Sequence, residues 1–281
     1  MTRTVLLTAI MLAPFALSAA ASAATPEEAF ERGRTCLSEG DLRGALKEYA
    51  DAARAAPDND SYLKEFMLVR NAVLLKHNLA KTEDQKQWLP MAKGLRAFYA
   101  GNGLLQQALE LDKQIHAKTN TSFTAMQLAE TQLALDLNVD AEKVLSALTD
   151  KSTTASRALL AIALVRQGKS AEARTIAEAT VASDKAGPIT LYDLARMQAA
   201  LGNADESITL LTDSFEATLP SRLDLFKRHA AKCPEFTSIV KSPSFQKALA
   251  TESKVTESEC SSGSSCASCP MRGGCANSGG Q

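Results

Sequence analysis

The sequence predicts an all-α protein built as a solenoid of stacked helical hairpins, and three observations carry this prediction. Residues 154–188 hold two stretches of helical apolar periodicity, separated by Gly168, where a left-handed residue ends a helix at little cost. Comparable turn residues are Gly103, Asp136 and Gly202, and the four turns recur at intervals of roughly 33 residues. Aromatic residues make up only 5% of the chain against 45% hydrophobic residues, which favours close-packed helices over sheets.

A second set of positions repeats with the same spacing. Small residues expected near the start of each second helix are Ala108, Ala141, Ala173 and Ser207, and their intervals match those of the turns one by one. Small side chains let paired helices approach closely, and neither helix of such a hairpin can bury its apolar face alone. A period held over four consecutive units therefore predicts an array of hairpins that stack on one another.

The first residues have the pattern of an export signal, which we place at 1–24. Arg3 supplies a positive start, 5–17 is an apolar run too short to span a membrane comfortably, and 21–23 read Ala-Ser-Ala before the cleavage point. We expect the mature chain to begin near Ala24 or Thr25 in a bacterial periplasm or outside the cell. We expect no transmembrane segment in the mature chain.

The first hairpin is expected between Pro26 and Pro57. Pro26 suits the first position of a helix, and Gly40 suits the turn between the two helices. Pro57 then ends the second helix, because proline cannot continue the hydrogen-bond ladder. The solenoid as a whole is predicted to extend over residues 25–250.

Residues 60–87 interrupt the regular pattern. The apolar residues from Tyr62 to Leu79 predict one long helix, 81–87 is polar, and Trp88 opens the next helix. The interval from Gly40 to Gly103 is close to two repeats, yet only one helix fits in the extra length. We therefore expect an unpaired helix here.

The end of the solenoid is predicted to be a cap over residues 221–250. A last amphipathic helix starts near Pro220, and apolar residues such as Phe236 and Phe245 follow in two proline-containing turns. Such residues would cover the exposed end of the stack. Beyond it, residues 251–281 are rich in Ser, Gly and Cys, cannot build a core, and are expected to be a flexible tail.

The first unit has a specific set of residues in its hairpin, namely Gly33, Gly40, Ala45, Tyr49, Ala52 and Pro57. This spacing resembles a tetratricopeptide repeat (TPR), although Cys36 stands where that family usually has a large aromatic residue. The resemblance covers roughly residues 26–220. It implies a right-handed solenoid whose first helices line a concave face that holds a peptide or a helix.

The resemblance also implies which residues face that groove, and we expect a protein or peptide ligand there. The positively charged members could bind a carboxylate of the partner. The residues predicted to line the groove are Arg34, Lys93, Met126, Glu130, Arg166, Tyr192 and Arg196.

Four tail cysteines, Cys260, Cys266, Cys269 and Cys275, form the densest group of reactive side chains. Disulfides are favoured because the chain is expected to be exported. One zinc ion held by four thiolates is the alternative, and otherwise no cofactor is expected. The run 266–275 is similar to cysteine runs that bind auxiliary iron–sulfur clusters in some radical enzymes, but nothing else in the chain resembles them.

Several other classes of function find no support. The formal net charge is −1, so no global basic field attracts nucleic acid. Residues 167–170 read Gln-Gly-Lys-Ser but lack the glycine five positions earlier that a phosphate-binding loop needs. The three histidines are scattered, without metal-ligand spacing. We expect no enzyme and no catalytic residue.

The sequence therefore predicts an exported scaffold for protein–protein interaction. Two alternatives stay open. The first is a metal- or thiol-handling protein that works through its cysteine tail and uses the solenoid for docking. The second is a purely structural protein of the cell envelope.

Overall fold

A computed structural model describes residues 24–148, 152–180 and 186–256, and these form two compact units, one up to Leu74 and one from Leu75. The described residues are helical, with no strand among them. The helices are α1 (Pro26–Ser38), α2 (Leu42–Ala55), α3 (Asp60–Leu79), α4 (Gln85–Gly101), α5 (Leu105–Thr119), α6 (Ser122–Ala134), α7 (Asn138–Ser146), α8 (Thr154–Arg166), α9 (Ser170–Glu178), α10 (Pro188–Ala200), α11 (Ala204–Glu216), α12 (Pro220–Ala230), the 3-10 turn η2 (Pro234–Phe236) and α13 (Pro243–Leu249).

Consecutive helices pack as hairpins, as the sequence predicts. In the first unit α1 packs along α2, and in the second unit the pairs are α4 with α5, α6 with α7, α8 with α9 and α10 with α11. Successive hairpins of the second unit also touch, because α5 packs on α6, α7 on α8, and α8 on α10. This arrangement is the stack of hairpins expected from the period of the sequence.

The predicted turn residues are confirmed by their backbone. Asp136 has φ 56, and the four glycines Gly40, Gly103, Gly168 and Gly202 have φ between 75 and 86. This left-handed region costs a residue with a side chain about 1–2 kcal/mol and glycine very little. The five turns of the hairpins therefore share one conformation, and only the turn at Asp136 carries a side chain.

The predicted small residues are confirmed as the crossing points of the helices. Ala108, Ala141, Ala173 and Ser207, and also Ala45 in the first unit, are each 0% exposed. A larger side chain at these positions would push the paired helices apart. The period in the sequence therefore corresponds to a period in packing.

The first unit is held by a close approach of α1 and α2. A Cβ atom added to Gly33 would lie 2.6 Å from the Tyr49 ring, so only glycine fits there. Phe30 stacks between Tyr49 and Tyr62, with ring centroids 5.1 and 4.6 Å away. Tyr62 belongs to α3, and this helix is the single unpaired helix that the sequence predicts.

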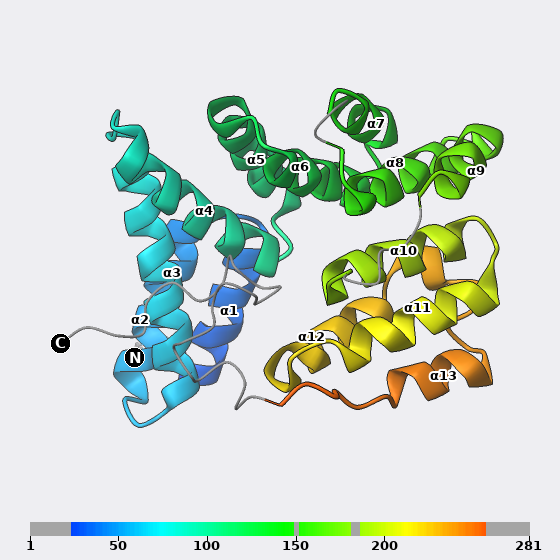
Figure 1. Ribbon diagram of the computed structural model, residues 1–281. Helices are drawn as coiled ribbons and strands as arrows, with labels where there is room; N and C mark the ends of the chain where they lie inside the picture. The colour runs from blue at the N-terminus through cyan, green and yellow to red at the C-terminus, as the bar shows by residue number, and fades with distance from the viewer. Residues whose placement is uncertain (1–23, 149–151, 181–185, 257–281) are drawn as a thin grey trace, which may run out of the picture. The chain divides into compact units, whose positions relative to one another are not determined.

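The apolar residues expected to form the cap are buried in the second unit. Phe236 and Phe245 are fully buried, together with Phe215 of α11, and α13 packs against α11. In Figure 1, α13 lies beside α11 in the second unit. The segment after α12 thus closes the apolar end of this unit.

Some predictions lie outside the described residues. These are the signal peptide up to residue 23 and the four tail cysteines between 257 and 281. Whether residues 25–250 form one continuous solenoid stays a prediction. Within the described part of the chain, none of the helices combines the length and the apolar character needed to cross a bilayer.

Candidate binding face and its buried charge cluster

Five charged side chains come together near the cap of the second unit. They belong to η2 and to α6, α8 and α10, each of which is the first helix of its hairpin. We call Glu130, Arg166, Asp193, Arg196 and Glu235 the charge cluster. Arg196 is 4% exposed and lies at its centre. Its Nη1 donates to Glu130 Oε1 at 2.6 Å and to Asp193 Oδ1 at 3.3 Å, and its Nε donates to Glu235 Oε2 at 3.1 Å.

Glu235 comes from η2, and it joins the cap to the hairpins. Its other carboxylate oxygen, Oε1, accepts a hydrogen bond from Nη2 of Arg166 at the end of α8. Arg166 Nη1 also donates to the Leu133 carbonyl of α6 at 2.7 Å. One carboxylate of the cap therefore binds two arginines, from two successive hairpins.

Three more polar side chains adjoin the charge cluster. The buried Cys233 thiol donates to Glu235 Oε2 at 2.8 Å. The Tyr192 hydroxyl and Nδ1 of His229 lie 2.7 Å apart, with the Tyr192 ring edge-on to Phe236. Since the Tyr192 and Cys233 side chains are buried, both serve here to satisfy or cover the charges.

Burial and charge act in opposite directions on two carboxyl groups of the charge cluster. Burial alone would raise the pKa of Glu235, but Arg196, the Cys233 thiol and Arg166 outweigh it and hold the pKa at about 2. Burial and the nearby Glu130 raise the pKa of Asp193 to about 8, despite Arg196. The two shifts therefore keep Glu235 ionised beside both arginines at neutral pH and favour the protonated form of Asp193.

Burial also sets the state of the neighbouring groups. It raises the pKa of the Cys233 thiol to about 12, with Arg196 opposing the shift. It lowers the pKa of His229, and Arg196 adds to this effect. At neutral pH the Cys233 thiol is therefore protonated, and it is not the thiolate that nucleophilic or metal chemistry needs.

A second buried polar network joins α4, α5 and α6. Arg96 Nε donates to both carboxylate oxygens of Asp112, at 2.9 and 3.1 Å, and Arg96 Nη2 donates to the Thr131 hydroxyl at 2.8 Å. Gln127 Nε2 donates to Asp112 Oδ1 at 3.0 Å. Because Asp112 is 2% exposed and fully hydrogen-bonded, this network fixes the contact between successive hairpins.

The seven residues predicted to line a groove have different surroundings. Glu130, Arg166, Tyr192 and Arg196 come together in or beside the charge cluster, where they bind groups of the chain itself. The sequence did not predict these internal contacts, although partner binding by the four residues stays a prediction.

The other three predicted groove residues lie apart from the charge cluster. Arg34 belongs to the other unit, is 63% exposed, and pairs with Glu31 at 3.2 Å. Lys93 on α4 is exposed, and Met126 on α6 is half-buried, its sulfur accepting from the Thr153 hydroxyl at 3.6 Å.

Lys93 and Met126 occupy the same position in successive repeats. The next two residues at this position, spaced like the turn residues, are Ala158 in α8 and Tyr192 in α10. Ala158 is 0% exposed and Tyr192 is 6% exposed. At this repeated position the first helices are therefore exposed at α4, half-buried at α6, and buried at α8 and α10, near the cap.

Sequence reasoning missed Asp193, Glu235, Cys233 and Asp112 as members of these networks. Asp112 carried a signal, because it lies on the apolar face of α5 between Leu109 and Ile115. Glu235 lies between the buried residues Cys233 and Phe236, but its partner Arg166 is 69 residues earlier in the chain. In the described residues no group of three or more His, Cys, Asp or Glu side chains is arranged to hold a metal ion.

No protein-family model matches the chain, and no curated protein matches it. A thermophilic TPR protein of Thermus thermophilus shares 18% identity with a TM-score of 0.38, over 74% of this chain and 98% of that one. A tetratricopeptide repeat protein of Parabacteroides merdae shares 17% identity with a TM-score of 0.40, over 80% and 93% of the two chains.

The hairpin period, the left-handed turns and the fully buried small residues of this chain define an array of stacked helical hairpins.

Proposed function

Starting from this tetratricopeptide-type array, we propose that the chain is an exported scaffold that binds a peptide or a partner protein on the face of its first helices. The observation that carries the proposal is the exposure of Lys93 on α4, together with the partial exposure of Met126 at the same repeated position of α6, where it also packs on the core. An exposed cation on one helix and a flexible thioether on the next first helix suit a partner segment with an acidic and an apolar side chain.

The cap supports this choice of surface. The internal carboxylates of Glu235 and Glu130 already pair with Arg166 and Arg196, so an acidic partner gains little at that end. Lys93, by contrast, has no ion-pair partner among the residues described. A partner's carboxylate therefore finds an available cation at Lys93, on the α4–α6 part of the face.

Affinity capture from the cell envelope tests the proposal. The bait is the intact chain, compared with a form truncated after Thr251 and carrying the same tag. If both forms retain the same specific protein, the helical array is the binding element. Loss of that protein with the tail would contradict the proposal and favour the metal- or thiol-handling alternative, since the four tail cysteines are then required.

Export is tested separately. We expect the mature protein in the envelope fraction to begin near Ala24 or Thr25, as measured by intact mass and N-terminal sequencing. A full-length chain that stays in the cytoplasm would contradict this part of the proposal, whatever the capture experiment finds.

A further inference from the structure

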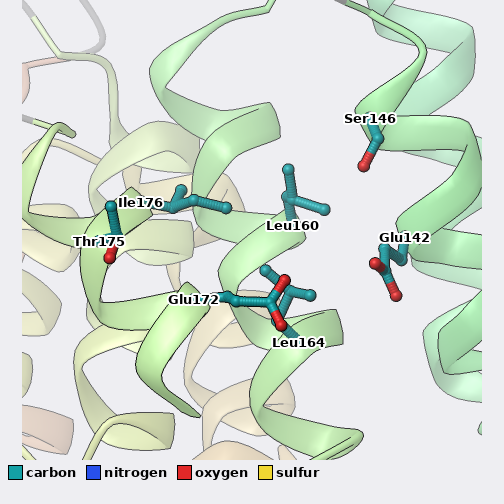
Figure 2. A pocket seen from close by; sticks show the side chains of 7 residues that line it. All are labelled: Glu142, Ser146, Leu160, Leu164, Glu172, Thr175 and Ile176. Carbon is teal, nitrogen blue, oxygen red and sulfur yellow. The ribbon is translucent and has the colours of Figure 1, made fainter. Parts of the chain in front are cut away.

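A cavity of about 330 Å³ opens between α7, α8 and α9 of the second unit. Figure 2 shows its lining: Leu160 and Leu164 of α8 and Ile176 of α9 provide the apolar part, and the carboxylates of Glu142 and Glu172 come from α7 and α9. This volume is at the lower end of the range for small-ligand pockets. The cavity therefore suits one side chain better than a whole cofactor.

The chain itself shows how one of these carboxylates binds an ammonium group. Lys169 Nζ lies 2.9 and 2.7 Å from the two carboxylate oxygens of Glu142. Hydrogen bonds from Lys169 and from Gln167 lower the pKa of Glu142, so this carboxylate is ionised at neutral pH. Glu172 is exposed and, in the part of the chain that the structure describes, has no ion-pair partner.

Glu172 has an ordinary structural role as well. It lies in the first turn of α9, where a negative charge favours the helix dipole. This role does not neutralise the carboxylate, which still lies at the edge of an apolar cavity. The cavity thus combines an apolar wall with one paired and one available negative charge.

The next hairpin has a cavity in the corresponding place, but with different chemistry. Arg174 and Gln198 stand one repeat after Glu142 and Leu164, and both line a second cavity of about 520 Å³. Glu206, which corresponds to Glu172, lines it too. A cation at Arg174 and an amide in place of a leucine make the second cavity a natural control.

We propose that the cavity between α7, α8 and α9 is a docking site for a basic side chain, a lysine or an arginine, on the surface of a partner protein. The methylene stem of such a side chain would pack on Leu160, Leu164 and Ile176, and its charged end would reach the carboxylate of Glu172. The proposal rests on the scaffold function for the existence of a partner, but it uses a different surface from Lys93 and Met126.

A titration with small probes tests the chemistry of this cavity. The mature chain, labelled with ¹⁵N, is titrated with n-hexylammonium, with methylammonium and with hexanoate while backbone amide shifts are followed. We expect saturable shifts in α7, α8 and α9 for n-hexylammonium only, because it alone has both the stem and the positive charge. Equal shifts with hexanoate or methylammonium, or shifts located elsewhere, would overturn the proposal.

A matched pair of variants isolates the carboxylate of Glu172. Glu172→Gln should weaken n-hexylammonium binding about fivefold, as expected for one exposed charge pair at contact distance. Glu206→Gln removes the same charge from the second cavity and should leave the binding unchanged. If the two variants behave alike, the proposal fails.

The same variants distinguish this inference from the scaffold proposal. A Glu172→Gln variant that binds n-hexylammonium like wild type, together with intact capture of a partner, would reject only the docking site. Failure to capture any partner, with the probe bound in the cavity, would reject only the scaffold function.

Discussion

Replacing Glu235 by glutamine should destabilise the second unit by about 3–5 kcal/mol. Glu235 is 8% exposed, and its two oxygens bind Arg166 and Arg196. Glutamine has nearly the same shape but no charge, so the buried Arg196 is left with Glu130 and Asp193, and the part-buried Arg166 with the exposed Asp136 at 3.7 Å. Removing one partner of a buried, hydrogen-bonded ion pair typically costs this amount, because the charge that remains is uncompensated.

The assay is urea unfolding followed by the fluorescence of Trp88, which is the single tryptophan of the chain and lies in α4 of the same unit. The control is Glu110→Gln, whose partner Lys113 lies at the surface, with side chains 64% and 51% exposed. Such a surface pair contributes at most about 1 kcal/mol. Equal midpoints for the two variants would refute the role assigned to Glu235.

The pH dependence provides a second check on Glu235. Its pKa is about 2 in the folded chain and about 4.3 in an unfolded one, so the folded state favours the ionised form. The stabilisation is present above pH 5 and is lost as pH falls toward 2. The difference in stability between wild type and Glu235→Gln should therefore shrink over that interval, and a constant difference would contradict the argument.

Three further predictions concern packing, titration and the thiol. Gly33→Ala should destabilise the first unit by about 1–3 kcal/mol, because the added Cβ lies 2.6 Å from the Tyr49 ring. The control Gly101→Ala adds a Cβ that meets no atom within 4 Å, so it should not destabilise the protein. Urea unfolding followed by circular dichroism compares the two variants. The pKa of Asp193 is about 8 when folded and about 3.9 when unfolded, so stability should fall as pH rises from 4 to 8, by up to about 1.4 kcal/mol per unit. Asp193→Asn should lack this slope when unfolding is measured at several pH values. Cys233 is buried and its thiol has a pKa of about 12, so an alkylating reagent should leave it unmodified in the native chain and modify it in the unfolded chain. Peptide mass mapping after alkylation measures this difference.

The sequence was most informative where backbone geometry is local. The turn at Gly168 and the small residue Ala173 follow directly from helix ends and helix crossings, and both are confirmed. Asp136 is recognisable only because the period requires a turn there, since aspartate alone does not require a left-handed backbone. The single helix α3 was also predictable, because no helix-breaking residue interrupts the series of apolar residues along it.

The charge cluster was much harder to predict. The residues of the first helices could be assigned to one face, but that assignment does not say whether solvent, a partner or the chain itself covers them. The answer depends on Glu235, which reaches Arg166 across 69 residues of sequence. No local pattern specifies such a contact, so Tyr192 and Arg196 were predicted as groove residues without their internal partners.

The central claim is that a partner binds the accessible face at α4 and α6, and one affinity measurement tests it most directly. The protein recovered by envelope capture would be titrated against wild type, against Lys93→Glu combined with Met126→Asp, and against Lys113→Glu as a surface control on α5. We predict that the first variant weakens binding at least tenfold with unchanged helical content, while the control binds like wild type. Unchanged affinity of the Lys93 and Met126 variant would contradict the claim and move the binding site away from this face.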